Sequence, residues 1–165
     1  MTDTVTMTNT IASTQALALL IAANATPVVV AKLANDRWAA PLDFGSVLRD
    51  GQRLFGAHKT WRGLIVGTLA GTIAAALMHL PLWVGAGFAM ASLLGDALSS
   101  AVKRRLKLQP GREIPGLDQL GEALLPLVLF AGPLSLDGQQ IALVTIVFCV
   151  LDLASARLRH REWLR

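Results

Sequence analysis

The chain has 165 residues, of which 53% are hydrophobic and only 16% charged, and its formal net charge is +4. A soluble domain carries roughly 25% charged residues, so this composition, with a mean hydropathy of +0.52, excludes an ordinary soluble domain. The apolar residues form blocks near the ~20 residues that cross a bilayer. The sequence therefore predicts one integral membrane domain over residues 1–165.

Five apolar segments predict an all-α, polytopic membrane helix bundle. In chain order the expected spans are 11–31, 64–80, 82–102, 120–134 and 140–156. The first is expected to be retained rather than cleaved as a secretory signal, because no Lys or Arg precedes its apolar run. The fourth contains Pro126, which predicts a kink with a neighbouring helix covering the freed backbone carbonyl.

The basic residues indicate the topology. All fifteen Lys and Arg lie in three regions: six in 32–63, five in 103–119 and four in the C-terminal tail. Cytoplasmic loops are enriched in Lys and Arg, and five spans place all three regions on one side. We therefore expect an outside N-terminus, cytoplasmic loops at 32–63 and 103–119, and a cytoplasmic C-terminus, in the inner (cytoplasmic) membrane. This placement accounts for the positive charge without a nucleic-acid partner.

The stretch GDALSSAVKRR, residues 95–105, gives the first chemical signal. Asp96, Ser99 and Lys103 have i, i+3 and i+7 spacing, so they share one helix face. An ionisable residue within a membrane segment is costly and usually faces a cavity or a partner. A local ion pair between Asp96 and Lys103 or Arg104 is the structural alternative.

The two predicted cytoplasmic loops add further candidates. Asp118 stands just before the fourth span, so antiparallel packing would bring it near Asp96. Mg²⁺ is commonly held by one or two carboxylates together with substrate phosphates, and basic side chains neutralise phosphate charge. The stretch HKTWRG at 58–63 is compatible with interfacial anchoring or with a phosphate clamp in which Trp61 or Phe55 stacks on a base.

Six motifs, taken in order, resemble the CDP-archaeol synthase family, which are membrane CTP-dependent cytidylyltransferases related to phosphatidate cytidylyltransferases. The motifs are NATPV (24–28), PLDFG (41–45), DGQRLFG (50–56), HKTWRG (58–63), GDALSSAVKRRL (95–106) and PGLDQL (115–120). The resemblance implies a five-helix enzyme that joins CTP to a phosphorylated lipid glycerol in the bilayer. It also implies release of diphosphate and Mg²⁺ as the cofactor.

The resemblance also assigns roles to residues. It implies that Asp96 and Asp118 bind the metal. The family pattern has an acid at the position of Gly121, so Glu122, one residue further on, is the third metal candidate. The implied phosphate contacts are Lys59, Arg62, Lys103 and Arg104, with Lys59 and Lys103 counted as catalytic. Asn24, Thr60, Trp61 and Ser99 complete the implied substrate-binding set.

The expected reaction is attack by a lipid phosphate oxygen on the α-phosphorus of CTP, with catalysis by positioning and charge neutralisation. The alternative is a non-enzymatic membrane protein of the same fold, such as a small transporter or an assembly subunit. Glycine-rich helix faces permit a homodimer. The identity of the lipid acceptor stays open.

Overall fold

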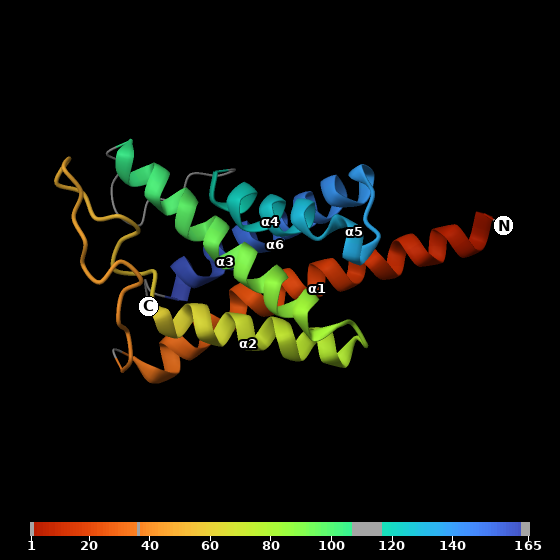
Figure 1. Ribbon diagram of the computed structural model, residues 1–165, viewed down its shortest axis with the longest axis horizontal. Coiled ribbons are helices and arrows are strands. Elements are labelled where there is room, and N and C mark those ends of the chain that lie inside the picture. Colours follow the sequence, from red (N-terminus) through yellow and green to blue (C-terminus); the bar gives the residue numbers. More distant parts are fainter. Residues whose placement is uncertain (1, 36, 107–116, 163–165) are drawn as a thin grey trace.

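The computed structural model describes the backbone of residues 2–35, 37–106 and 117–162, and the side chains of 9–35, 37–106 and 119–155. This described part is helical apart from two isolated bridges in one loop. The helices are α1 (Thr2–Ala34), α2 (Trp61–Leu77), α3 (Leu82–Arg105), α4 (Leu117–Leu129), α5 (Ala131–Leu134) and α6 (Gly138–Glu162). The fold confirms the predicted all-α membrane bundle (Figure 1).

Three helical segments are long and apolar enough to cross a bilayer: Asn9–Ala34, Leu82–Arg105 and Gly138–Ser155. Helices α2 and α4 are apolar but shorter. The outer face of α2 carries Ile65, Leu69, Ile73 and Leu77, which recur every four residues and are 55–77% exposed. A stripe of large exposed apolar side chains along a helix is expected where lipid, rather than water, surrounds the bundle.

The core lies where α1, α3, α4 and α6 meet. Its largest buried apolar side chains are Leu19, Leu20, Val84, Phe88, Leu127 and Phe148. Beside it, α2 packs closely on its neighbours through glycine. A methyl group at Gly71 would overlap Ala89, and one at Gly85 would overlap the carbonyl of Gly71. These small residues therefore allow the two helices to pack closely.

The fourth predicted span, 120–134, is broken into α4 and α5. The break is at Phe130, and Pro126 itself lies inside α4. Proline has no N–H, so the carbonyl of Glu122 loses its usual helical donor. The Ser92 hydroxyl of α3 donates to that carbonyl over 2.8 Å. A neighbouring helix covers the freed carbonyl, as predicted, but the chain bends one turn beyond the proline.

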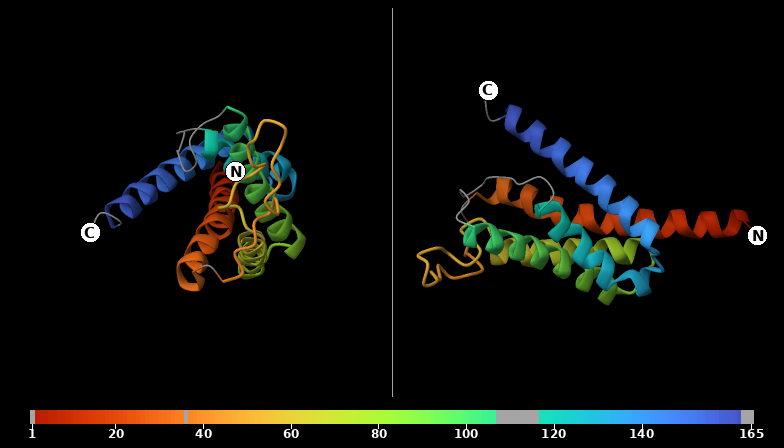
Figure 2. Two further views of the ribbon diagram at one scale, coloured as in Figure 1. Left: turned by 90° about the vertical axis from the view of Figure 1, so that its left-hand side faces the viewer. Right: turned by 90° about the horizontal axis from the view of Figure 1, so that it is seen from above.

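Figures 1 and 2 show how the ends of the helices are grouped. The loop before α2, the end of α3, the start of α4 and the end of α6 lie at one end of the bundle in Figure 1. The N-terminus, the α2–α3 turn and α5 lie at the other. The three basic regions thus share one end, whereas its assignment to the cytoplasm stays a prediction. Residues 107–116 of the second predicted loop lie outside the described residues.

Candidate active site

Helices α3 and α4 cross at two glycines. A methyl group at Gly95 would overlap the carbonyl oxygen of Gly121, and one at Gly121 would lie 2.7 Å from the carbonyl oxygen of Gly95. This contact between two backbones gives Gly121 a packing role at the position where the family pattern has an acid. It also brings the next residues of the two helices, Asp96 and Glu122, together.

Asp96 and Glu122 form a carboxylate pair with Lys59. The Lys59 ammonium is ion-paired with Oδ2 of Asp96, and both side chains are partly buried. The carboxyl group of Glu122 lies within hydrogen-bonding range of Asp96 and within electrostatic range of Lys59. Two negative charges at this range repel each other. One lysine balances the charge of only one carboxylate, so the pair can accept a further cation.

A chain of hydrogen bonds beside the carboxylate pair links helices α1, α3 and α4. Asn24 Nδ2 of α1 donates to Ser92 Oγ over 2.9 Å, and Ser92 in turn donates to the carbonyl of Glu122. Asn24 Nδ2 also donates to the carbonyl of Leu20 in its own helix. Asn24, predicted to bind substrate, is placed within the bundle as a link between α1 and α3.

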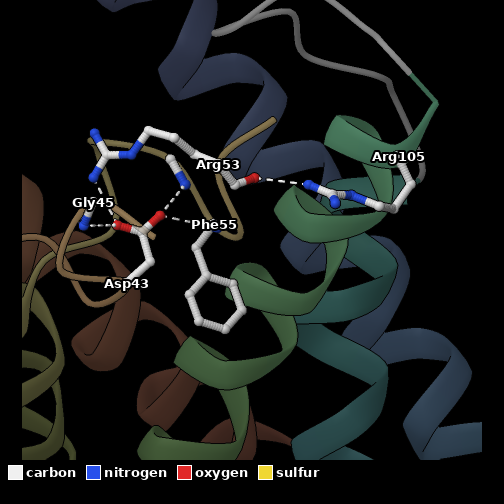
Figure 3. A network of polar contacts seen from close by, with 6 residues as sticks. Asp43, Gly45, Arg53, Phe55 and Arg105 are labelled. Atoms are coloured by element: carbon white, nitrogen blue, oxygen red, sulfur yellow. Dashed lines mark hydrogen bonds and ion pairs between the residues drawn. The ribbon is translucent and has the colours of Figure 1, made fainter. Parts of the chain in front are cut away.

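The loop between α1 and α2 is organised by Asp43 (Figure 3). Its buried carboxylate accepts hydrogen bonds from Arg53 Nη2 at 2.6 Å and from the backbone N–H groups of Gly45, Phe55 and Gly56 at 3.0–3.2 Å. Burial by itself raises the pKa of Asp43, but the Arg53 guanidinium and the three N–H donors outweigh it. The pKa of Asp43 is therefore held well below its usual range.

The end of α3 fixes this loop to the bundle. Arg105 Nη1 pairs with Asp50 Oδ2 at 2.9 Å, and Arg105 Nη2 donates to the carbonyl of Arg53 at 2.9 Å. Arg104 lies against Gly56, where a methyl group would be 2.7 Å from its Nη2. Gly56 also has φ +98, so this position favours glycine for both space and backbone conformation. Arg104, predicted to contact phosphate, thus lies at the loop-facing end of α3.

Lys59 reaches Asp96 because the last residues of the α1–α2 loop run back alongside its first residues. Leu42 N–H donates to the carbonyl of Lys59, and Pro41 forms a bridge with Thr60. Thr60 is the N-cap of α2, and its hydroxyl accepts from the Gly63 N–H at 3.1 Å. Thr60, predicted to bind substrate, therefore fixes the start of α2 and the exit direction of Lys59.

The remaining predicted residues of HKTWRG lie on the outer surface. Arg62 Nη1 donates to the carbonyls of Asn35, at 2.8 Å, and Arg37, just beyond the end of α1. The Trp61 ring is 5.9 Å from that of Phe44. Trp61 and Arg62 border a surface pocket of about 400 Å³, which is also lined by Trp38, Ala40, Ile65 and Val66. The structure thus separates Trp61 and Arg62 from the Asp96–Glu122 pair.

On α3, Ser99 is buried and donates to the backbone carbonyl of Asp96 at 2.9 Å. Lys103 follows one turn later in the last turn of α3. Asp118 is in the first turn of α4, but its side chain lies outside the described residues. Among the side chains that the structure describes, no three of His, Cys, Asp or Glu are placed to hold a metal ion. Of the three predicted metal-binding residues, Asp96, Asp118 and Glu122, the structure describes the side chains of two, Asp96 and Glu122, and these two are neighbours.

Sequence reasoning missed Asp152 on α6. Its Oδ2 accepts from Gln119 Nε2 of α4 at 3.1 Å, and it is within electrostatic range of Glu122. The signal was available, because Asp152 is a carboxylate inside the predicted span 140–156, and intramembrane charges are rare outside functional sites. Asp43 was also missed as an organiser of the loop, although it lies in the PLDFG motif.

The chain is similar in sequence to one family of known proteins. A family model described as "CarS-like: CDP-archaeol synthase" matches residues 11–86 and 82–162. The chain is 34% identical to the CDP-archaeol synthase of Pyrococcus abyssi, over 86% of this chain and 88% of that protein. It is 40% identical to that of Pyrococcus furiosus, over 67% and 68% of the two chains.

One solved structure is similar in both sequence and fold. It is described as an intramembrane enzyme for archaeal membrane lipids biosynthesis. The TM-score is 0.74 at 34% identity, and the match covers 86% of this chain and 90% of the other. The residues matched by the family model, 11–86 and 82–162, include both helices that carry the carboxylate pair.

Proposed function

Since this chain belongs to the CarS-like CDP-archaeol synthase family, we propose that it activates a lipid glycerophosphate at the Asp96–Glu122 pair. The family makes it a membrane-embedded nucleotidyltransferase that uses CTP and a lipid phosphate to form a CDP-lipid. Membership of this enzyme family excludes the alternative of a non-enzymatic transporter or assembly subunit. The finer proposals concern the acceptor, the residues and the metal.

The reaction balances without a strong base. An anionic oxygen of the lipid phosphate forms a bond to the α-phosphorus of CTP as the bond from that phosphorus to the bridging oxygen breaks. Diphosphate leaves with the electron pair. Little proton transfer is needed, so catalysis rests on positioning and charge neutralisation.

One observation supports this location most directly: a loop lysine, Lys59, meets two carboxylates contributed by membrane helices. A substrate lipid has its phosphate at the boundary between the bilayer and water, and CTP comes from water. The Asp96–Glu122 pair lies where a loop joins the membrane helices, so both substrates can reach it. Positive charge for the phosphates of both substrates comes from Lys59 and from Lys103 and Arg104 in the last turn of α3.

The carboxylates suit Mg²⁺. Asp96 and Glu122 offer hard oxygen donors at short range from each other, and Mg²⁺ is commonly bound by one or two carboxylates plus substrate phosphates. We propose that these two residues hold Mg²⁺, with Asp118 as the third member. When bound, the ion would neutralise charge on the triphosphate of CTP.

The test is purified protein with Mg²⁺, labelled CTP and matched lipid phosphates. The acceptors are a diether glycerophosphate, a diester glycerophosphate and a polyprenyl monophosphate that lacks glycerol. We expect labelled CDP-lipid from one or both glycerophosphates and none from the polyprenyl phosphate. Product from the polyprenyl phosphate alone would contradict the proposed acceptor class, and no product from any acceptor would contradict the activity.

A further inference from the structure

Helix α6 contributes one described carboxylate to the membrane region. Asp152 lies within the apolar segment Gly138–Ser155, where burying a charge is costly unless it has a partner. Figure 2 shows that the C-terminal part of α6 diverges from the other helices. A contact made by Asp152 with another helix would fix α6 against the bundle.

The contact is with the first turn of α4. Gln119 is only 1% exposed, and its Nε2 donates to Asp152 Oδ2 at 3.1 Å. The contact is partly buried, and a hydrogen bond to a charged acceptor is stronger than one between neutral groups. Gln119 follows Asp118 and precedes Glu122 by three residues, so it shares a helix face with Glu122.

The Gln119–Asp152 hydrogen bond joins the first turn of α4 to α6. Further along α4, Gly121 packs against Gly95 and the Glu122 carbonyl is held by Ser92, both from α3. The α4 turn is therefore held between two neighbours. Gly95 and Ser92 of α3 hold Gly121 and the Glu122 carbonyl, and Asp152 of α6 holds Gln119 in the turn before them.

We propose that Asp152 is a positioning residue for cytidylyl transfer, which acts by holding Gln119 and thereby orienting Glu122 toward Asp96. This inference rests on the proposed function. Asp152 itself touches neither of the reacting groups in this role. Its effect comes through the rotation of α4, and small misplacements of catalytic groups are known to cost up to about a hundredfold in rate.

The test compares two substitutions of Asp152. Asp152→Leu removes charge and acceptor, whereas Asp152→Asn removes the charge but keeps an oxygen that can accept from Gln119. We expect Asp152→Leu to lower kcat about 10–100-fold with less than about a threefold change in KM for CTP. We expect Asp152→Asn to restore kcat to within about threefold of the wild type.

Gln119→Leu provides a second route to the same result if Asp152→Leu folds poorly. It should reproduce the loss of kcat, and the double variant Gln119→Leu/Asp152→Leu should be no worse than either single one. The matched control is Thr145→Val, a buried α6 hydroxyl that bonds only to the carbonyl of Ile141 among the contacts described; its kcat should be unchanged.

Two outcomes overturn the role of Asp152. If Asp152→Asn is as impaired as Asp152→Leu, the charge acts directly on the carboxylates and not through Gln119. If both variants keep full kcat while the wild type is active, the contact is only structural. A wild type that makes no CDP-lipid would instead overturn the proposed function on which the role depends.

Discussion

Two aspartates of this chain are paired with basic side chains in different ways. Asp43, in the α1–α2 loop, accepts hydrogen bonds from Arg53 and from three backbone N–H groups (Figure 3). Asp96, on α3, is paired with Lys59 and faces a second carboxylate, Glu122. The first carboxylate is surrounded by donors, and the second has another carboxyl group as a neighbour.

We propose that the difference separates a structural carboxylate, Asp43, from a functional one, Asp96. Donors from several directions stabilise the ionised form of Asp43 and order the loop around it. Two carboxylates at close range cost energy in the absence of a bound cation, and such arrangements are found mainly at functional sites. Asp43 is therefore expected to govern stability, and Asp96 turnover.

The largest expected effect is that of Asp96→Asn. Removing the charge from the carboxylate pair should lower the rate of CDP-lipid formation by about 10²–10³-fold, the range seen when one group that stabilises transition-state charge is lost. The measurement is the initial rate with labelled CTP and the preferred lipid phosphate. Thermal unfolding in detergent serves as the control and should change little. Full turnover in this variant would move the site elsewhere.

Gly95→Ala tests whether the helix crossing brings the carboxylates together. The added methyl group meets the Gly121 carbonyl, so α3 and α4 must separate, at a cost of about 1–3 kcal/mol in the free energy of unfolding. We expect a loss of roughly tenfold in kcat, because Glu122 moves away from Asp96. Gly132→Ala is the matched control, since a methyl group there meets nothing within 4 Å. Equal behaviour of the two variants would refute the crossing as the cause.

Asp43→Asn should affect stability rather than chemistry. Losing the charged acceptor should destabilise the loop by about 1–3 kcal/mol, with only a few-fold loss of kcat through the placement of Lys59. Hydrogen exchange of the backbone amides of Phe55 and Gly56 measures the first effect. A rate loss as large as that of Asp96→Asn would contradict the distinction between the two aspartates.

The low pKa of Asp43 gives the loop a defined pH dependence. Its folded pKa is below that of the unfolded chain, so the unfolded loop binds more protons and acid destabilises the folded one. The stabilisation is complete above the unfolded value of about 4 and is lost as the pH falls below it toward the folded pKa. The protection factors of the loop amides in the wild type, which correct for the intrinsic exchange rate, should fall over that range, and Asp43→Asn should remove this dependence.

The smallest effect is expected for Asp50→Asn. The Arg105–Asp50 pair is about one-third exposed on both sides, and exposed ion pairs contribute about 0–1 kcal/mol. Arg105 also donates to the carbonyl of Arg53, which this substitution leaves in place. Neither the unfolding temperature nor kcat should change measurably, and a clear loss of either would show that the loop depends on more than the Asp43 network.

Much of the fold was predictable from the sequence. The apolar blocks predicted the helices. Pro126 predicted that a neighbouring helix covers the backbone carbonyl freed by the proline. The break at Phe130 was not predicted, because it depends on how α4 meets the following turn. Sequence patterns also could not predict that Asn24, Thr60 and Arg62 bond to backbone or neighbouring side chains, since helix spacing does not say which neighbour is within reach.

The sequence by itself determined the membrane bundle and the family, and it predicted a role for Asp96, because hydropathy and ordered motifs are properties of the linear chain. Only the tertiary structure decided which charges meet. Glu122 reaches Asp96 because Gly95 and Gly121 let two backbones touch, Lys59 reaches it because a loop returns on itself, and Asp152 joins through Gln119. These contacts depend on distances between helices, and those distances are set by packing.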